Sequence, residues 1–113
     1  MKKISGFILL ASSLLLLAFQ CDKEENLVAS CIQDKIATFS TEACPTGATI
    51  KSYYFQSDFV YVFDYGPCGA DMALPVLNNY CDTLGFLGGF SGNTIINNQD
   101  FASAEFLHTV WFN

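Results

Sequence analysis

The sequence predicts an α+β domain, with one N-terminal helix packed on an antiparallel sheet of about four or five strands and braced by disulfides. Residues 31–41 carry apolar side chains at helical spacing. Later runs are rich in aromatic and β-branched residues and are separated by turn residues. Four cysteines spread over the same region fit a small exported domain.

Residues 1–20 predict an export signal. The sequence begins with Met1-Lys2-Lys3, and residues 4–19 are almost wholly apolar, which is the order of a secretory signal peptide. A membrane-spanning helix takes about 20 apolar residues, and this run is shorter and interrupted by serines and a glycine. We therefore expect residues 1–20 to be removed on export.

A cysteine follows the apolar run at once. The stretch Ala18-Phe19-Gln20-Cys21 resembles the end of a bacterial lipoprotein signal, in which the cysteine thiol receives a diacylglyceryl group and becomes the new N-terminus. The usual pattern has Gly or Ala just before the cysteine, so Gln20 departs from it. The resemblance implies that Cys21 is the lipidation site and that two acyl chains hold the protein at a membrane.

The residues after Cys21 are charged. Lys23, Glu24 and Glu25 resemble the export tag that sends lipoproteins to the outer face in one large phylum of Gram-negative bacteria; the alternative is a plain solvated tether. We expect a signal peptide over 1–20, an acidic tether over 21–29 and one domain over 30–113. The expected location is the outer membrane of a Gram-negative bacterium, exposed at the cell surface.

The charge balance excludes several partners. Without residues 1–20 the chain keeps all eleven acidic residues and three lysines, a formal charge of −8, and it has no arginine. Nucleic acid binding and attachment to anionic lipid through charge both need clustered Lys and Arg. We therefore expect no nucleic acid partner, and a membrane contact made through lipid alone.

The predicted elements follow in order along the chain. In the helix over 31–41, Ile32, Ile36 and Phe39 form one apolar stripe. Two β-rich runs, 48–56 and 59–65, form a hairpin joined at Ser57-Asp58. A strand, a turn at Asn78-Asn79 and a return strand ending at Gly88-Gly89 come next. The remaining elements are a short strand or loop near 91–98, one helical turn over 100–104 and a closing strand over 105–113.

Cysteine spacing favours two disulfides over a zinc site. Cys31, Cys44, Cys68 and Cys81 contain no close C-x2-C pair, which structural zinc sites typically show. A helix between Cys31 and Cys44 would separate them by about 15–20 Å, beyond the ~7 Å limit for bridged α-carbons. Cys44 and Cys68 instead flank the open end of the hairpin. We therefore expect a Cys44–Cys68 disulfide, which leaves Cys31 to pair with Cys81. If residues 31–41 are not helical, the other pairings become open again.

Several motifs together resemble a known family. They are Cys31-Ile32-Gln33-Asp34-Lys35-Ile36, Tyr54-Phe55-Gln56, Val60-Tyr61-Val62-Phe63, Cys68-Gly69-Ala70-Asp71 and Leu87-Gly88-Gly89. They resemble small exported bacterial lipoproteins that contain a domain of unknown function, over roughly residues 30–112. The resemblance implies an exported, cysteine-braced domain and carries no activity.

Candidate catalytic and modification residues are few. His108 is the only histidine, and no serine sits in a nucleophile-elbow context; we expect His108 on the solvent face of the last strand. Asp64 and Asp71 flank a turn and could pair as acid and base. Residues 88–100 are rich in Gly and Asn but have one carboxylate, which favours turns over calcium. Asp82-Thr83-Leu84 resembles a bacterial O-glycosylation acceptor, with Thr83 as the site.

The function expected from these residues is binding rather than catalysis. We expect a lipid-anchored surface or periplasmic domain, without catalytic residues, cofactor or metal. It would bind a protein or glycan partner through aromatic side chains on its sheet face, since aromatics dominate binding hot spots. The alternative is a small hydrolase or inhibitor-like module that uses acidic residues near Cys68.

Overall fold

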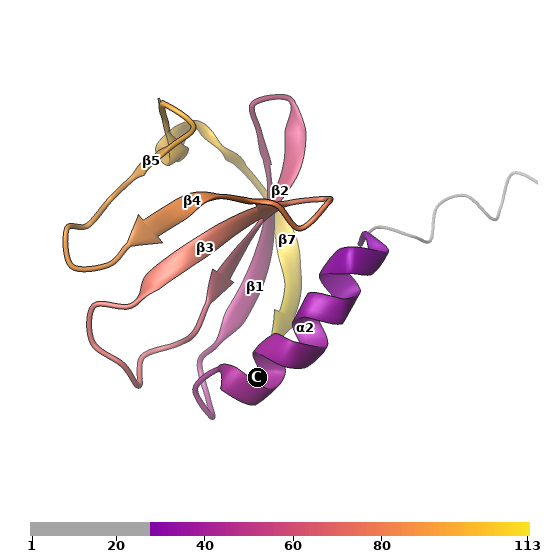
Figure 1. Cartoon of the computed structure of the whole chain (residues 1–113), viewed down its shortest axis with the longest axis vertical. Coiled ribbons are helices and arrows are strands. Elements are labelled where there is room, and N and C mark those ends of the chain that lie inside the picture. The colour runs from indigo at the N-terminus through magenta and orange to yellow at the C-terminus, as the bar shows by residue number, and fades with distance from the viewer. Residues whose placement is uncertain (1–27) are drawn as a thin grey trace, which may run out of the picture.

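The computed structural model describes residues 28–113, which form one helix packed on a five-stranded antiparallel sheet (Figure 1). The predicted fold class is confirmed. The helix is α2 (Ser30–Glu42). The strands lie in the order β4-β3-β2-β1-β7, and their bounds are β1 (Thr49–Phe55), β2 (Asp58–Asp64), β3 (Ala73–Asn78), β4 (Thr83–Gly88) and β7 (Glu105–Phe112).

The predicted helix is confirmed and is one residue longer at each end. Its stripe faces the sheet: Ile32 and Phe39 are buried, and Ile36 is partly buried against the same core. Phe39 makes the main contact between the helix and the sheet. Its ring centroid lies 5.3 Å from that of Phe63 and 5.6 Å from that of Trp111, and both pairs are edge-to-face. One helical side chain thus touches β2 and β7 together.

The β1–β2 hairpin forms as predicted, but its turn is one residue earlier than expected. Phe55 pairs with Asp58, so the turn is Gln56-Ser57, and Asp58 is the first residue of β2. Both turn residues have positive φ, 53° and 62°. That is the backbone of a type I′ turn, whose twist matches the two strands. Neither residue is a usual choice for this turn, which explains the wrong prediction.

The sheet is covered on both faces, which the sequence pattern did not indicate. The second cover is a small hairpin, β5 (Ile95–Ile96) with β6 (Gln99–Asp100), followed by the 3₁₀ turn η2 (Phe101–Ser103). Ile96 enters a core on this face with Phe55, Val60, Val62 and Val76. Consequently β2 is buried on both sides over residues 60–63, and its hydrophobicity is continuous instead of alternating.

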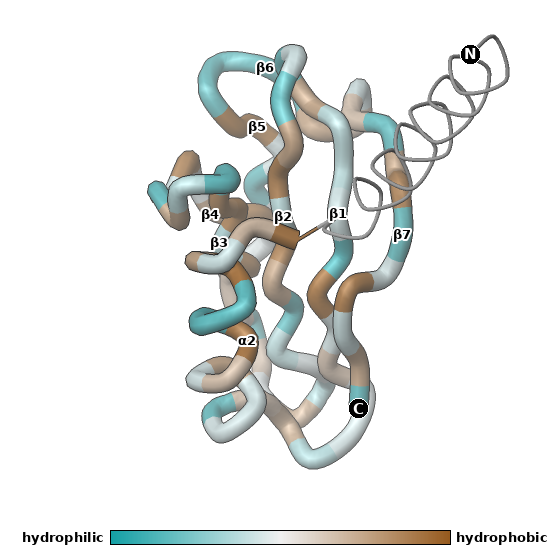
Figure 2. Tube along the Cα trace, turned by 90° about the vertical axis from the view of Figure 1, so that its right-hand side faces the viewer, coloured by the Kyte–Doolittle hydropathy of each residue, from teal (hydrophilic) through white to brown (hydrophobic). Residues whose placement is uncertain are grey.

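The closing strand β7 returns to the first hairpin and pairs with β1 (Figure 2). Its register shifts twice, between Ile50 and Lys51 and between Ser52 and Tyr53, which leaves Val110 and Leu107 as extra residues. Such bulges re-aim side chains. Val110 and Trp111 both pack on the core beneath α2, and Leu107 and His108 both face the hollow described below.

Two disulfides tie the loops to this frame, Cys44–Cys68 and Cys31–Cys81, with α-carbons 5.7 Å and 6.1 Å apart. They are the pairs that the hairpin geometry predicts. The first closes the open end of the β1–β2 hairpin, and the second joins the start of α2 to the β3–β4 turn. In the part of the chain that the structure describes, no helix is long and apolar enough to cross a membrane.

Candidate functional site

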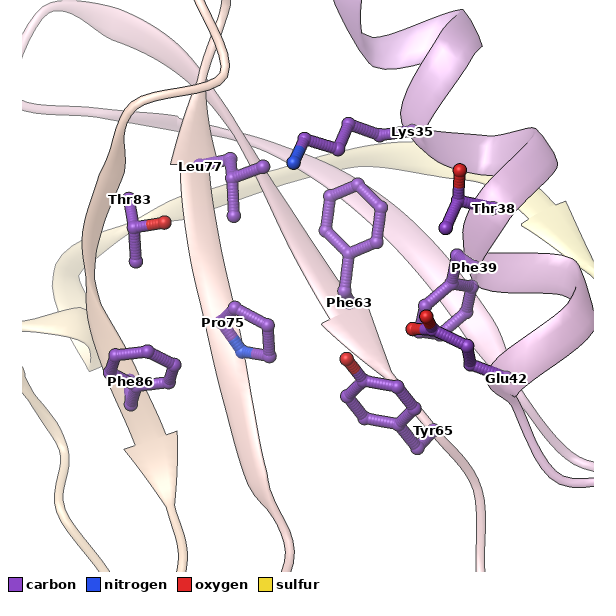
Figure 3. Close-up of a pocket in the computed structure, with 10 residues that line it drawn as sticks. All are labelled: Lys35, Thr38, Phe39, Glu42, Phe63, Tyr65, Pro75, Leu77, Thr83 and Phe86. Atoms are coloured by element: carbon purple, nitrogen blue, oxygen red, sulfur yellow. The ribbon is translucent and has the colours of Figure 1, made fainter.

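Because α2 crosses the sheet, it leaves parts of the sheet face uncovered, and two hollows open beside it. The first, the α2–β4 hollow, has a volume of about 350 Å³ (Figure 3). Its walls come from α2 and β4, and its floor from β2 and β3. The lining residues are Lys35, Thr38, Phe39, Glu42, Phe63, Tyr65, Pro75, Leu77, Thr83 and Phe86.

The floor of the α2–β4 hollow is apolar and its rim is polar. Phe63 and Leu77 are buried in the core beneath it, whereas Phe86 on β4 stays 53 % exposed. Figure 3 shows Lys35 and Glu42 reaching from the helix on the same side as Thr38. Apolar and aromatic walls with a few polar groups are the usual composition of a binding site for small groups.

The second hollow, here the N-terminal hollow, lies where the chain enters the domain and has a volume of about 630 Å³. Val28 and Ala29, just before α2, form one side of it, and β1, β2 and β7 form the others. Its remaining lining residues are Ser52, Phe59, Tyr61, Asn79, Leu107 and His108. Val28 and Ala29, which the sequence placed in the tether, therefore pack against the folded domain.

The only histidine lies beside a buried serine in this hollow. The Oγ of Ser52 is 3.2 Å from Nδ1 of His108 and donates to the backbone carbonyl of His108 at 3.2 Å. His108 is exposed, as expected, while Ser52 is 3 % exposed. A hydroxyl that gives its proton to a carbonyl can accept one from Nδ1, so this geometry satisfies a polar side chain buried in mid-strand.

Tyr61 and Asn79 also line the hollow, and the hydroxyl of Tyr61 donates to Oδ1 of Asn79 at 3.0 Å. Burial raises the pKa of Tyr61 above its usual value of 10.0; a hydrogen bond with the backbone of Ala29 acts in the opposite direction, and the negative charge of Asp58 adds to the increase. Tyr61 is therefore neutral at physiological pH and fixes the floor of the hollow to the β3–β4 turn.

The predicted carboxylate pair is not brought into either hollow. Asp64 accepts a hydrogen bond from the backbone N–H of Gly66 at 2.9 Å, and Asp71 is exposed in the following loop with a φ of 54°. In residues 88–100, the side chain of Asn93 donates to the carbonyls of Phe86 and Ile95, and Asp100 accepts from the N–H of Ala102. Within residues 28–113 no three His, Cys, Asp or Glu side chains group as metal ligands do.

The remaining predicted sites divide between the surface and the undescribed part of the chain. Thr83 is exposed at the start of β4 and lines the α2–β4 hollow. Cys21 and the predicted export tag, Lys23, Glu24 and Glu25, lie outside the described residues. Sequence reasoning missed both hollows, because each is assembled from strands that only the sheet order brings together.

Aromatic side chains divide between the core and the surface. Phe39, Phe55, Tyr61 and Phe63 are buried. The more exposed ones are Tyr54, Phe59, Tyr80, Phe86, Phe90, Phe106 and Phe112. Among the exposed group, Phe86 lines the α2–β4 hollow and Phe59 the N-terminal hollow, so each hollow has an aromatic at its rim.

Comparison with known proteins identifies the family and nothing more specific. No curated protein and no solved structure matches this sequence. One family model, a domain of unknown function called DUF6970, matches residues 37–113, which include the last part of α2 and the whole sheet. The chain belongs to the DUF6970 family.

Proposed function

We propose that this protein is an exported lipoprotein, anchored through Cys21 and exposed at the outer membrane of a Gram-negative bacterium. In this proposal its folded domain is a non-catalytic binding module, and the α2–β4 hollow is where its partner makes contact. The partner is a protein or a glycan that places an apolar or ring-shaped group on the aromatic floor.

The export part rests on the sequence before residue 28 and is supported by the cysteines of the domain. Cys31–Cys81 and Cys44–Cys68 join segments that are 50 and 24 residues apart. Disulfides of this kind persist in oxidising compartments and are rare in the cytosol. Small secreted domains often carry such bonds, which reinforce a hydrophobic core of limited size.

The binding part rests on one observation: Phe86 remains half exposed on the wall of a hollow whose floor is the aromatic core. A partner that covers Phe86 removes apolar surface from water, which favours binding at roughly 25 cal/mol per Å². Lys35 and Glu42, both on α2 and both lining the hollow, offer charges of opposite sign that can set the orientation of a partner.

We also propose that Thr83, which lines the same hollow, is an O-glycosylation site. If it carries an O-linked glycan, that sugar lies on the wall of the α2–β4 hollow, because Thr83 lines it. The intact mass of the protein from its native host tests this: a mass above that of the lipidated chain, lost on Thr83→Ala, supports the glycan. An unchanged mass rejects it.

A photo-crosslinking pair tests the binding proposal. A benzophenone amino acid replaces Phe86 in one variant and Phe90 in the other, in cells that export the full chain. Phe90 is 92 % exposed on the β4–β5 loop and does not line the hollow, so it is a matched control. We expect a discrete crosslinked product from position 86 alone. The same products from both positions, or none from position 86, would reject the hollow as the contact.

The alternative function, a small hydrolase or inhibitor-like module using acids near Cys68, has less support. The carboxylate of Asp64 is engaged by the N–H of Gly66, and Asp71 is exposed in a loop away from both hollows. A hydrolytic activity that is lost in the Asp64→Asn variant, while the free energy of unfolding stays the same, would support this alternative.

A further inference from the structure

Three exposed side chains with apolar surface lie in or beside the lining of the N-terminal hollow. Tyr54 is 42 % exposed, Phe59 is 48 % exposed and Leu107 is 37 % exposed. Tyr54 and Phe59 face each other across the β1–β2 hairpin with ring centroids 5.6 Å apart, and Phe59 and Leu107 both line the hollow. These three residues are named the hairpin patch below.

The chain enters the domain at this patch. Val28 and Ala29 line the same hollow as Phe59 and Leu107. Cys21 is seven residues before Val28. A fully extended chain of that length spans at most about 25 Å. A lipid on Cys21 therefore holds the N-terminal hollow close to the membrane surface, whatever path the tether takes.

The chemistry of the patch fits a neutral lipid interface. Tyrosine and phenylalanine, with an apolar ring, favour the boundary between headgroups and acyl chains. The two lysines in the described part of the chain lie elsewhere: Lys35 lines the other hollow, and Lys51 is three residues before Tyr54, on the opposite face of β1. Glu105, which pairs with Tyr54, lies beside the patch, so anionic lipid repels it.

We propose that the hairpin patch lies against the membrane, so that Tyr54, Phe59 and Leu107 enter the headgroup boundary. This inference rests on the lipid anchor proposed above. Lipid attachment gives the patch a high effective concentration at the bilayer, so a small apolar contact suffices to orient the domain. The far end of the sheet, where β1 begins opposite Phe112, then points away from the membrane.

Two phenylalanine positions give a matched test. Phe59 belongs to the patch, and Phe112 is 72 % exposed and pairs with Thr49, five residues along β1 from Tyr54. At about 3.4 Å per residue this separation is about 17 Å. Phe59→Trp and Phe112→Trp each add a second tryptophan to Trp111. The full chain is expressed, the protein is purified from membranes, and it is reconstituted into phosphatidylcholine vesicles with brominated acyl chains, which quench tryptophan on contact.

We expect the added emission of Phe59→Trp to be largely lost in brominated vesicles and that of Phe112→Trp to be retained. Replacing part of the phosphatidylcholine with phosphatidylglycerol should restore emission at position 59, because anionic lipid repels Glu105 beside the patch. Vesicle flotation, measured on the same samples, reports the anchor independently.

Each other outcome overturns the inference. Flotation with equal quenching at both positions, or with none at position 59, rejects the membrane contact and leaves the anchor standing. Failure to float rejects the anchor and the contact together. If iodide in solution cannot reach the tryptophan at position 59 even in detergent, another copy of the chain or another protein covers the patch instead.

Discussion

Ile96 packs directly over Gly85. Its Cδ1 methyl lies 2.9 Å from the point where a β-carbon on Gly85 would stand. Gly85 is in β4, opposite Val76 of β3, and Ile96 is 1 % exposed in the core on that face. The missing side chain therefore lets the β5–β6 hairpin approach the sheet and close its second face.

Gly85→Ala is expected to destabilise the domain. A new methyl group inside a packed core typically lowers the free energy of unfolding by about 1–3 kcal/mol. Replacing a glycine in a strand raises the same free energy by only about 0.5–1 kcal/mol, so the net effect is a loss of stability. Urea unfolding followed by circular dichroism measures the change. Adding Ile96→Val to Gly85→Ala removes the Cδ1 methyl that clashes with the new β-carbon and should recover part of the lost stability. The stability changes of the two single variants should therefore not add up to that of the double variant. Additive effects, or a Gly85→Ala variant as stable as the original, would contradict this packing.

Ser57→Gly is expected to stabilise the domain by up to about 1 kcal/mol. Ser57 has a φ of 62° in the type I′ turn, a conformation that costs a residue with a β-carbon about 1–2 kcal/mol, and the entropy of glycine offsets part of that cost. Gln56 stays unchanged, because its side chain donates to the carbonyl of Asn97 at 3.0 Å and so joins two turns. A lower urea midpoint for Ser57→Gly would show that the turn has another geometry.

Removing either disulfide is expected to lower the free energy of unfolding by about 3–4 kcal/mol, because the bonds close loops of 24 and 50 residues in the unfolded chain. The free energy of unfolding of a small domain is about 5–15 kcal/mol. Loss of both disulfides should therefore leave the chain largely unfolded. The variants are Cys44→Ala with Cys68→Ala, and Cys31→Ala with Cys81→Ala. Thr46→Ala, at an exposed residue of the loop after Cys44, is the control and should leave the urea midpoint unchanged. An unchanged midpoint in either double variant would indicate a different pairing.

Alkaline pH is expected to destabilise the domain through Tyr61. Burial raises its pKa in the folded state above 10.0, so above that pH the unfolded chain loses the proton first. The stabilising effect is complete below pH 10 and is lost as pH rises through the folded pKa. Tyr61→Phe should flatten the decrease in unfolding free energy between neutral and strongly alkaline pH. Tyr80→Phe, at a side chain 80 % exposed, should leave the decrease as it is. The same slope in all three proteins would contradict the assignment.

Local patterns were enough to predict the helix and the five strands of the main sheet. The stripe of Ile32, Ile36 and Phe39 fixed the helix, and the runs around Tyr54 and Phe63 fixed the first hairpin. From these two elements the cysteine pairing followed, because helix length excludes one pairing and hairpin closure favours another.

The tertiary relationships could not be predicted in the same way. Ser52 and His108 meet only because β7 pairs with β1, 56 residues away in sequence. Ile95-Ile96 is too short to be recognised as the cover of a second sheet face, and Gly85 carries no signal of what packs on it. Both hollows depend on such long-range pairings, so the candidate site appeared only with the sheet order.

The intact mass of the protein extracted from membranes of its native host tests the central claim most directly. The account predicts a chain that begins at Cys21, carries a diacylglyceryl group, and has Cys31, Cys44, Cys68 and Cys81 resistant to alkylation until a reductant is added. A chain that begins at Met1, with an unmodified Cys21 and freely alkylated thiols, would contradict it.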